Sequence, residues 1–306
     1  MTSSELPAVG FIGLGIMGAP MAGHLLRAGY PLYVYSRTRS KADALIEAGA
    51  TWCDDPAEVG RHCDLLLTIV TDTPDVEEVL VGPRGAVQTL RRGTCVVDMT
   101  TISPEVTRRL AEGLGRRGIT LLDAPVTGGD VGAREATLTI MVGGPAEAFE
   151  RVRPVLAKMG RNIVHVGPVG SGQTLKACNQ ILCAVNMIGV CEALLLAGRS
   201  GLDLEKAIAT LGGGAGGSWA LANLGPKIAS GDLAPAFMIR LIQKDLRIVQ
   251  EAARRAGVPL PGAALAQQLF RGVEALPGGG DRGTQAMILA YRRLAGEDVP
   301  PRRADA

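Results

Sequence analysis

Apolar residues follow two different patterns along the chain, and the change between them falls after residue 167. Before it, short apolar runs alternate with segments of helical periodicity, which is typical of parallel strands joined by helices. The near-continuous apolar run 64–70 indicates a strand covered on both faces. The pattern therefore predicts an α/β domain with a doubly wound Rossmann sheet. Predicted strands are 9–14, 31–36, 64–70, 93–99, a strand from residue 119, 137–144 and 162–166; predicted helices are 19–28, 40–48, one from residue 75, 104–115 and 145–159.

The second half of the chain has helical patterns and no strand pattern after residue 198. A long apolar run, 170–198, predicts a mostly buried helix that joins the two parts. Its length would also suit a transmembrane span, but the charged and amide residues inside it argue against one. We expect an NADP-binding domain over 1–167, an all-α domain for substrate binding and oligomerisation over 168–296, and a tail over 297–306. Further predicted helices are 204–211, 237–256, 263–276 and 284–294, with 212–217 as a flexible glycine loop.

Composition narrows the function classes. A chain of 306 residues with 47% hydrophobic and 20% charged residues has room for two folded domains. A net charge of +2 and 3% aromatic residues give no sign of nucleic-acid binding. The six cysteines form no C-x-x-C pair, and no group has metal-ligand spacing, so we expect reduced thiols, a metal-independent protein and a cytoplasmic location.

The first predicted strand leads into a glycine motif, G-x-G-x-x-G, that opens a helix. In this setting Gly13 permits a tight turn, Gly15 lets a pyrophosphate approach the backbone, and Gly18 permits close packing of helix on strand. The free N–H groups of the helix start suit phosphate oxygens. The motif predicts a dinucleotide cofactor bound by Gly13, Leu14, Gly15, Ile16, Met17 and Gly18.

The end of the second predicted strand indicates which dinucleotide binds. An NAD site places an acidic residue there to accept hydrogen bonds from the ribose hydroxyls. This chain has Ser36, Arg37 and Thr38 instead, followed by Arg39. Because a guanidinium and two hydroxyls suit a 2′-phosphate, we expect NADP(H) to be preferred, with NAD(H) possible. The alternative interpretation is that Arg37 is an ordinary exposed loop arginine that binds no ligand.

Three later strand ends offer further ligand contacts. Val70 ends the predicted strand 64–70, and Thr71 and Thr101 come just after predicted strands; all three should also border the cofactor. In the segment DAPVTGG, the hydroxyl of Thr127 and the backbone N–H groups of Gly128 and Gly129 form a small anion site suited to a carboxylate.

The long apolar helix carries one polar stripe. Lys176, Asn179, Gln180, Cys183 and Asn186 fall on one helical face. A core helix whose lysine reaches the surface would explain Lys176 alone. The other motifs of the chain point instead to chemistry at this residue.

Taken together, four motifs resemble the β-hydroxyacid dehydrogenase family. That family includes 3-hydroxyisobutyrate dehydrogenase, tartronate semialdehyde reductase and the glyoxylate/succinic semialdehyde reductases. The four motifs are FIGLGIMGAPMAGHLL, DAPVTGG, GSGQTLKACNQ and the Lys244-Asp245 pair, and the resemblance covers residues 9 to about 294. It implies hydride transfer between a nicotinamide and a short 3-hydroxy acid or semialdehyde acid.

The resemblance also implies roles for individual residues. Lys176 would be the catalytic acid and base, with Asn179 beside it on the substrate. Thr127, Gly128 and Gly129 would bind the substrate carboxylate, and Thr101 and Lys244 would border the nicotinamide. We expect Trp219 to contact the substrate's variable substituent. Threonine at 127, where serine is commonest in the family, adds a methyl group that could narrow the substrate range.

Two alternative functions remain open, and we also expect the protein to associate with copies of itself. The chain could be a catalytically idle NADP(H) sensor or scaffold, although such a protein needs no acid beside a carboxylate loop. It could also reduce an imine or oxidise an amino-acid alcohol, although imine reductases of this architecture usually lack the lysine. The apolar helices should bury surface against a second copy, giving a homodimer or homotetramer that binds a small carboxylic acid, no nucleic acid and no membrane.

Overall fold

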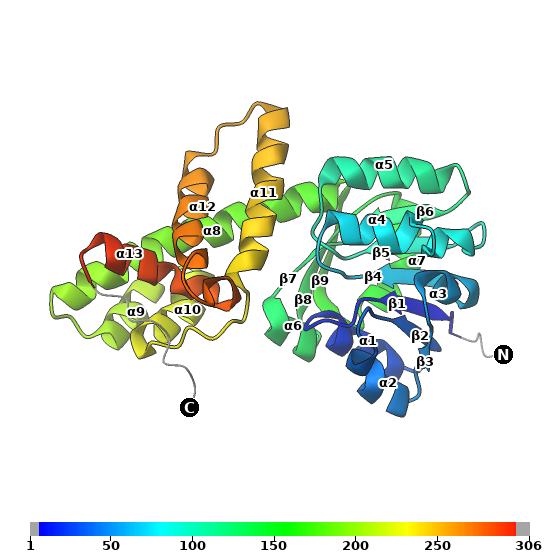
Figure 1. Cartoon of the computed structure of the whole chain (residues 1–306), viewed down its shortest axis with the longest axis horizontal. Coiled ribbons are helices and arrows are strands. Elements are labelled where there is room, and N and C mark those ends of the chain that lie inside the picture. The colour runs from blue at the N-terminus through cyan, green and yellow to red at the C-terminus, as the bar shows by residue number, and fades with distance from the viewer. Residues whose placement is uncertain (1–5, 298–306) are drawn as a thin grey trace. The chain divides into compact units, whose positions relative to one another are not determined.

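The computed structural model describes residues 6–297 (Figure 1). The chain divides into two compact units, residues 1–176 and 177–306, and the division falls within the long helix α8, Ser171–Arg199. The predicted tail begins at Glu297, whose carboxylate pairs with Arg199. Residues 298–306 of that tail lie outside the described residues.

The first unit is built on a sheet of nine strands in the described part of the chain, with β3-β2-β1-β4-β5-β6 all parallel. The strand order reverses beside β1, which lies between β2 and β4, and ligands of doubly wound sheets bind at such a point. Beyond β6 the sheet is mixed, because β8 runs antiparallel to β6 and β7 and parallel to β9. The predicted doubly wound Rossmann domain is confirmed. The strands are β1 Val9–Ile12, β2 Leu32–Tyr35, β3 Thr51–Trp52, β4 Leu65–Thr68, β5 Cys95–Asp98, β6 Thr120–Asp123, β7 Val126–Thr127, β8 Leu138–Gly143 and β9 Gly160–Gly167.

Helices cover both faces of this sheet (Figure 1). Alternate strand residues enter two separate cores: Phe11 packs with α1, α2 and α7, and its neighbour Ile12 packs with α3, α4 and α5. Burial on both faces explains why the central strands read as unbroken apolar runs. The helices are α1 Gly18–Arg27, α2 Asp43–Glu47, α3 Pro56–His62, α4 Thr73–Val81, α5 Pro104–Gly115, α6 Gly129–Glu135 and α7 Ala146–Leu156, with short 3₁₀ turns at Arg39–Ala42 and Ala86–Gln88.

The second unit is helical, as predicted. Among its described residues, β-type pairing is limited to an isolated bridge between Met238 and Gly283. Its core gathers apolar side chains from α8 and from the later helices, including Met187, Leu246 and Phe270. Those helices are α9 Leu204–Gly212, α10 Trp219–Ser230, α11 Ile239–Ala256, α12 Pro261–Glu274 and α13 Ile288–Leu294, with 3₁₀ turns at Gly279–Asp281 and Thr284–Met287.

In the described chain α8 is the one helix long and apolar enough to cross a membrane, a property that core helices of soluble proteins share. One face of this helix lies in the core of the second unit, with Ala184 and Cys191 fully buried. Length and composition alone therefore do not identify α8 as a membrane span.

Candidate functional site

Of the three glycines in the turn between β1 and α1, only one has open space beside its Cα atom. Gly13 has φ +104°, and a Cβ there would lie 2.1 Å from the carbonyl oxygen of Ile69; a Cβ on Gly18 would lie 1.9 Å from the Gly13 oxygen. A Cβ on Gly15, in contrast, would meet no protein atom within 4 Å. The fold itself therefore requires Gly13 and Gly18, whereas Gly15 keeps open the space that a pyrophosphate would use.

The remaining residues of the turn fit an anion as well. Leu14 is buried, Ile16 is exposed, and Met17 is the N-cap residue of α1. The first turn of α1 contains no acidic residue. Because backbone N–H groups at a helix start carry partial positive charge, this end of α1 suits a dinucleotide phosphate.

Ser36, Arg37 and Thr38 follow β2 directly, at the edge of the sheet that holds the glycine turn. The Arg37 guanidinium pairs with Asp75 of α4 at 3.0 Å, and its side chain is 74% exposed. An exposed ion pair of this kind contributes only about 0–1 kcal/mol, so a phosphate dianion could compete for the guanidinium. The adjacent Arg39 lies over the Trp52 ring, 5.6 Å from its centroid.

A buried polar cluster joins the ends of β4 and β5. Asp98 accepts a hydrogen bond from the Thr68 hydroxyl at 2.8 Å and one from the Thr100 backbone N–H at 3.1 Å. The Thr100 hydroxyl accepts from the Val70 N–H at 3.0 Å. Burial raises the pKa of Asp98 to about 6, against the lowering effect of these hydrogen bonds. The cluster fixes the two loops that carry the predicted cofactor contacts Val70, Thr71 and Thr101.

The first turn of α8 is fastened to the ends of β5 and β6. The Asp123 carboxylate accepts the backbone N–H groups of Gly170 at 2.7 Å and Gln173 at 2.8 Å. Burial raises the pKa of Asp123, and these two hydrogen bonds oppose that rise. The Gln173 amide donates to the Thr100 carbonyl at 2.6 Å and accepts from the Ile102 N–H at 3.1 Å. The helix that carries the predicted catalytic lysine therefore starts from a fixed position.

Lys176 lies one helical turn after Gln173 and is 7% exposed. It belongs to the same unit as the predicted carboxylate loop, in which Thr127 ends β7 and Gly129 begins α6. Gly128 between them has φ +128°. A buried lysine and an anion-binding turn are thus both present in the first unit.

A second polar cluster lies in the second unit, between α8 and α11. Asn179 donates to the Gln180 side-chain oxygen at 2.7 Å, and the Gln180 amide donates to Asp245 at 2.6 Å. The Lys244 ammonium stands 2.7 Å from the other oxygen of Asp245. The predicted substrate residue Asn179 and the predicted nicotinamide residue Lys244 are therefore parts of one network. Trp219, the first residue of α10, is 64% exposed and lies outside this network.

Four buried polar residues support these loops and helices: Asp123, Gln173, Gln180 and Asp245. Sequence patterns assign no individual role to Asp123, Gln173 or Gln180, and they indicate Asp245 only as a member of the Lys244-Asp245 motif. A polar residue inside an apolar run was the available signal for Gln173 and Gln180. Among the described residues there is no group of three or more histidine, cysteine or acidic side chains that could hold a metal ion.

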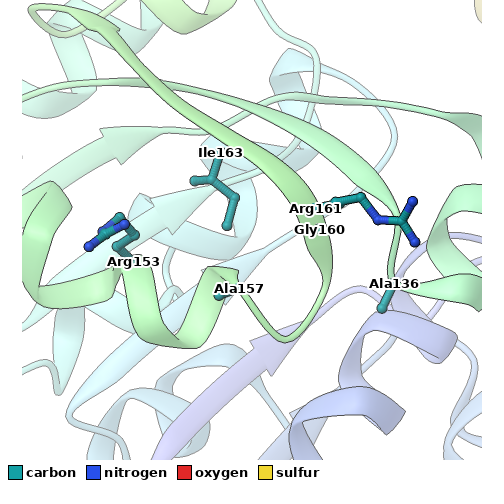
Figure 2. A pocket seen from close by; sticks show the side chains of 6 residues that line it. All are labelled: Ala136, Arg153, Ala157, Gly160, Arg161 and Ile163. Carbon is teal, nitrogen blue, oxygen red and sulfur yellow. The ribbon is translucent and has the colours of Figure 1, made fainter.

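A depression of about 470 Å³ on the first unit does not add to this site. It is lined by Ala136, Arg153, Ala157, Gly160, Arg161 and Ile163. Figure 2 shows the two guanidinium groups at opposite ends of it, on either side of Ile163. Arg153 also bonds to Glu150 at 3.1 Å, so the arginines do not converge on a common anion.

Two domain families match the chain. Residues 8–167 match the NAD-binding domain of 6-phosphogluconate dehydrogenase, and residues 170–291 match the NAD-binding domain of NADP-dependent 3-hydroxyisobutyrate dehydrogenase. The chain is 42% identical over 287 residues to 2-hydroxy-3-oxopropionate reductase of Escherichia coli, covering 94% of this chain and 98% of the relative. It is 38% identical over 269 residues to 3-hydroxyisobutyrate dehydrogenase of Pseudomonas aeruginosa, covering 86% and 90%.

A solved structure agrees with these matches. The 3-hydroxyisobutyrate dehydrogenase of Mycobacterium tuberculosis, determined with L-serine, superposes with a TM-score of 0.86 at 30% identity, covering 94% of this chain and 99% of that one. The relatives share a reaction class, but their names give different substrates.

Proposed function

The chain belongs to the β-hydroxyacid dehydrogenase family, of which 3-hydroxyisobutyrate dehydrogenase is a member, and on that premise we propose that it transfers hydride between NADP(H) and a short 3-hydroxy acid or its semialdehyde. It is an NAD(P)-dependent oxidoreductase. The observation that carries the finer proposal is the buried Lys176, one turn from a helix start that Asp123 and Gln173 fasten to the sheet.

Each protein group has a chemical task in this reaction. The bound nicotinamide would supply or accept the hydride. Lys176 donates a proton to the carbonyl oxygen as negative charge develops there, and takes it back as a neutral amine in the oxidative direction; such catalysis is worth about 10²–10⁴-fold. Thr127, Gly128 and Gly129 hold the substrate carboxylate, so that the reacting carbon is fixed relative to the lysine.

The preference for NADP(H) rests on Arg37. Its guanidinium already stands at the end of β2, where the adenosine ribose of a dinucleotide lies in this type of fold. The adjacent Ser36 and Thr38 supply hydroxyl donors, and no carboxylate occurs in residues 36–39 to repel a 2′-phosphate. The proposed cofactor is therefore NADP(H), with NAD(H) bound more weakly.

We also propose a cytoplasmic homodimer or homotetramer. Leu182 and Leu196, on α8, are 62% and 70% exposed. Large apolar side chains on one helix are commonly buried in the interfaces of homo-oligomers. Light scattering tests this proposal, and a strictly monomeric particle would refute it.

A panel of substrates tests the proposed reaction, and the loss of absorbance of the reduced cofactor measures turnover. Glyoxylate, succinic semialdehyde, 2-hydroxy-3-oxopropionate and methylmalonate semialdehyde are each assayed with NADPH and with NADH. We expect turnover of at least one with NADPH, and less with NADH. Tight NADPH binding without turnover of any would favour a cofactor sensor instead.

A further inference from the structure

The side-chain amide of Gln173 holds the loop after β5 on both sides of Thr101. Its NH₂ group donates to the Thr100 carbonyl at 2.6 Å, and its oxygen accepts from the Ile102 N–H at 3.1 Å. A neighbouring strand would pair with residue 101 through the same two backbone groups. Gln173 is 1% exposed, so its amide is shielded from water that could replace either bond. The backbone around Thr101 is therefore fixed to the first turn of α8.

The chemistry of this pair of bonds calls for an amide. A side chain must both donate and accept to make them, and an amide presents a donor and an acceptor side by side. The thioether of a methionine has no donor, and neither does an ionised carboxylate. Hydrogen bonding, and not volume alone, therefore accounts for glutamine at position 173.

The loop after β5 is also tied to the loop after β4. The Val70 N–H donates to the Thr100 hydroxyl at 3.0 Å, and the Ser103 N–H donates to the Thr73 hydroxyl at 3.3 Å. The two loops that carry predicted cofactor contacts are thus bonded to each other without any contribution from α8.

The start of α8 has a fastening of its own as well. The Asp123 carboxylate accepts the backbone N–H groups of Gly170 and Gln173 at 2.7 and 2.8 Å, which holds the first turn on β6. Lys176, 7% exposed, follows one turn later. The cofactor loops and the helix start are each held to the sheet by separate bonds, and the side chain of Gln173 joins the one to the other.

We propose that Gln173 is a positioning residue, which aligns a nicotinamide beside Thr101 with the proton donor Lys176. This rests on the proposed function, in which Thr101 borders the nicotinamide and Lys176 supplies the proton. All three residues belong to the first unit. The hydride adds to the carbonyl carbon and the proton to its oxygen, so the two donors need a fixed relative position. Misplacing a reacting group by about 1 Å can slow a reaction by about 100-fold.

Gln173→Met tests this role through the rate of NADPH oxidation in a single turnover with the best substrate of the panel. Methionine has nearly the length of glutamine but makes neither bond, so the rate should fall by about 10–100-fold. Affinity for NADPH should change by less than about threefold, because the bonds between the two cofactor loops remain. Gln285→Met is the matched control, since Gln285 is a buried glutamine that donates to the carbonyls of Asp232 and Ala234. It should keep the parent rate.

Gln173→Glu separates positioning from packing. A protonated glutamic acid has a donor and an acceptor and can restore both bonds, whereas its ionised form would face the Thr100 carbonyl. Burial beside that carbonyl should raise the pKa of the new carboxyl group. At about pH 6, Gln173→Glu should therefore react at least about fivefold faster than Gln173→Met, and this advantage should shrink as pH rises. The titratable groups around residue 173, Asp98, Asp123 and Lys176 among them, are the same in both variants, so their titration cancels in the ratio.

Each outcome decides the inference. A folded Gln173→Met protein with the parent's single-turnover rate would overturn it, and so would a Gln173→Glu protein with no advantage at any pH. If Gln173→Met alone fails to fold, the rate of Gln173→Glu relative to the parent replaces the ratio, and a value that does not rise as pH falls would overturn the inference. Failure of both variants to fold would assign Gln173 to folding instead. A parent protein without turnover of any panel substrate would refute the proposed function, a result that is distinct from all of these.

Discussion

The carboxylate of Asp123, at the end of β6, accepts the backbone N–H of Gln173 at 2.8 Å. The same carboxylate accepts the N–H of Gly170 at 2.7 Å, so one side chain from the sheet caps the start of the 29-residue helix α8. A negative group at a helix N-terminus is favoured by the unpaired N–H groups and by the helix dipole. Lys176 comes one turn later, and its position depends on this cap.

We expect Asp123→Asn to reduce the free energy of unfolding by about 2 kcal/mol, because one of two buried, charge-assisted hydrogen bonds is replaced by an opposed N–H pair. Urea denaturation measures the change. Asp130→Asn is the control, since Asp130 pairs with Arg134 at the surface and should contribute no more than about 1 kcal/mol. Equal small losses in both variants would show that the Asp123 cap is unimportant.

Two glycine variants separate folding from cofactor binding. Gly18→Ala forces a Cβ to within 1.9 Å of a backbone oxygen and should prevent stable folding, whereas a Cβ on Gly15 would meet no atom beyond its chain neighbours within 4 Å. Gly15→Ala should therefore keep the parent's thermal stability and weaken NADPH binding by at least about tenfold. Fluorescence titration of NADPH and a melting curve test both. Unchanged affinity in Gly15→Ala would place the dinucleotide elsewhere.

Arg37→Ala should weaken NADPH binding by about 10–100-fold and leave NADH binding nearly unchanged, because one charge-assisted contact to the 2′-phosphate is lost. Asp75→Asn is the control: it removes the ion-pair partner of Arg37 but keeps the guanidinium. That variant should bind NADPH at least as well as the parent. Equal losses for both cofactors in Arg37→Ala would contradict the predicted specificity.

Asp98 makes the stability of the protein depend on pH. The unfolded chain releases the Asp98 proton near 3.8, but the folded protein keeps it until about 6, so the folded state binds more protons between these values. Stability from this group falls as pH rises through that window. Asp98→Asn lacks this loss, so its stability relative to the parent should rise by about 2–3 kcal/mol between pH 4 and 6.5. A constant difference over the window would disprove the assignment.

Much of the fold could be predicted because apolar periodicity and glycine punctuation reflect local structure. The glycine turn at Gly13 is an example, since its strand–turn–helix setting is contiguous in sequence. The sequence did not predict α10, which begins directly after a glycine-rich loop, although Ser218 caps it by accepting the Leu221 N–H at 3.0 Å. A polar cap directly after a glycine-rich segment is a weak signal, and the first residue of that segment, Gly212, belongs to α9.

The support of the site could not be predicted, because its members are far apart in the chain. Gln180 and Asp245 are separated by 65 residues, and Gln173 and Thr100 by 73. Periodicity locates a buried polar residue but does not name its partner. Sequence motifs identify the candidate residues Lys176 and Asn179, whereas only the three-dimensional structure identifies the residues that hold them in place.

The central claim is that Lys176 transfers the proton during hydride transfer, and Lys176→Ala tests it most directly. Turnover of the best substrate is measured beside NADPH affinity, with Lys206→Ala, an exposed lysine of α9, as the control. The account predicts that Lys176→Ala binds NADPH as the parent does and loses turnover by at least about 100-fold. Near-parent turnover in Lys176→Ala would contradict it.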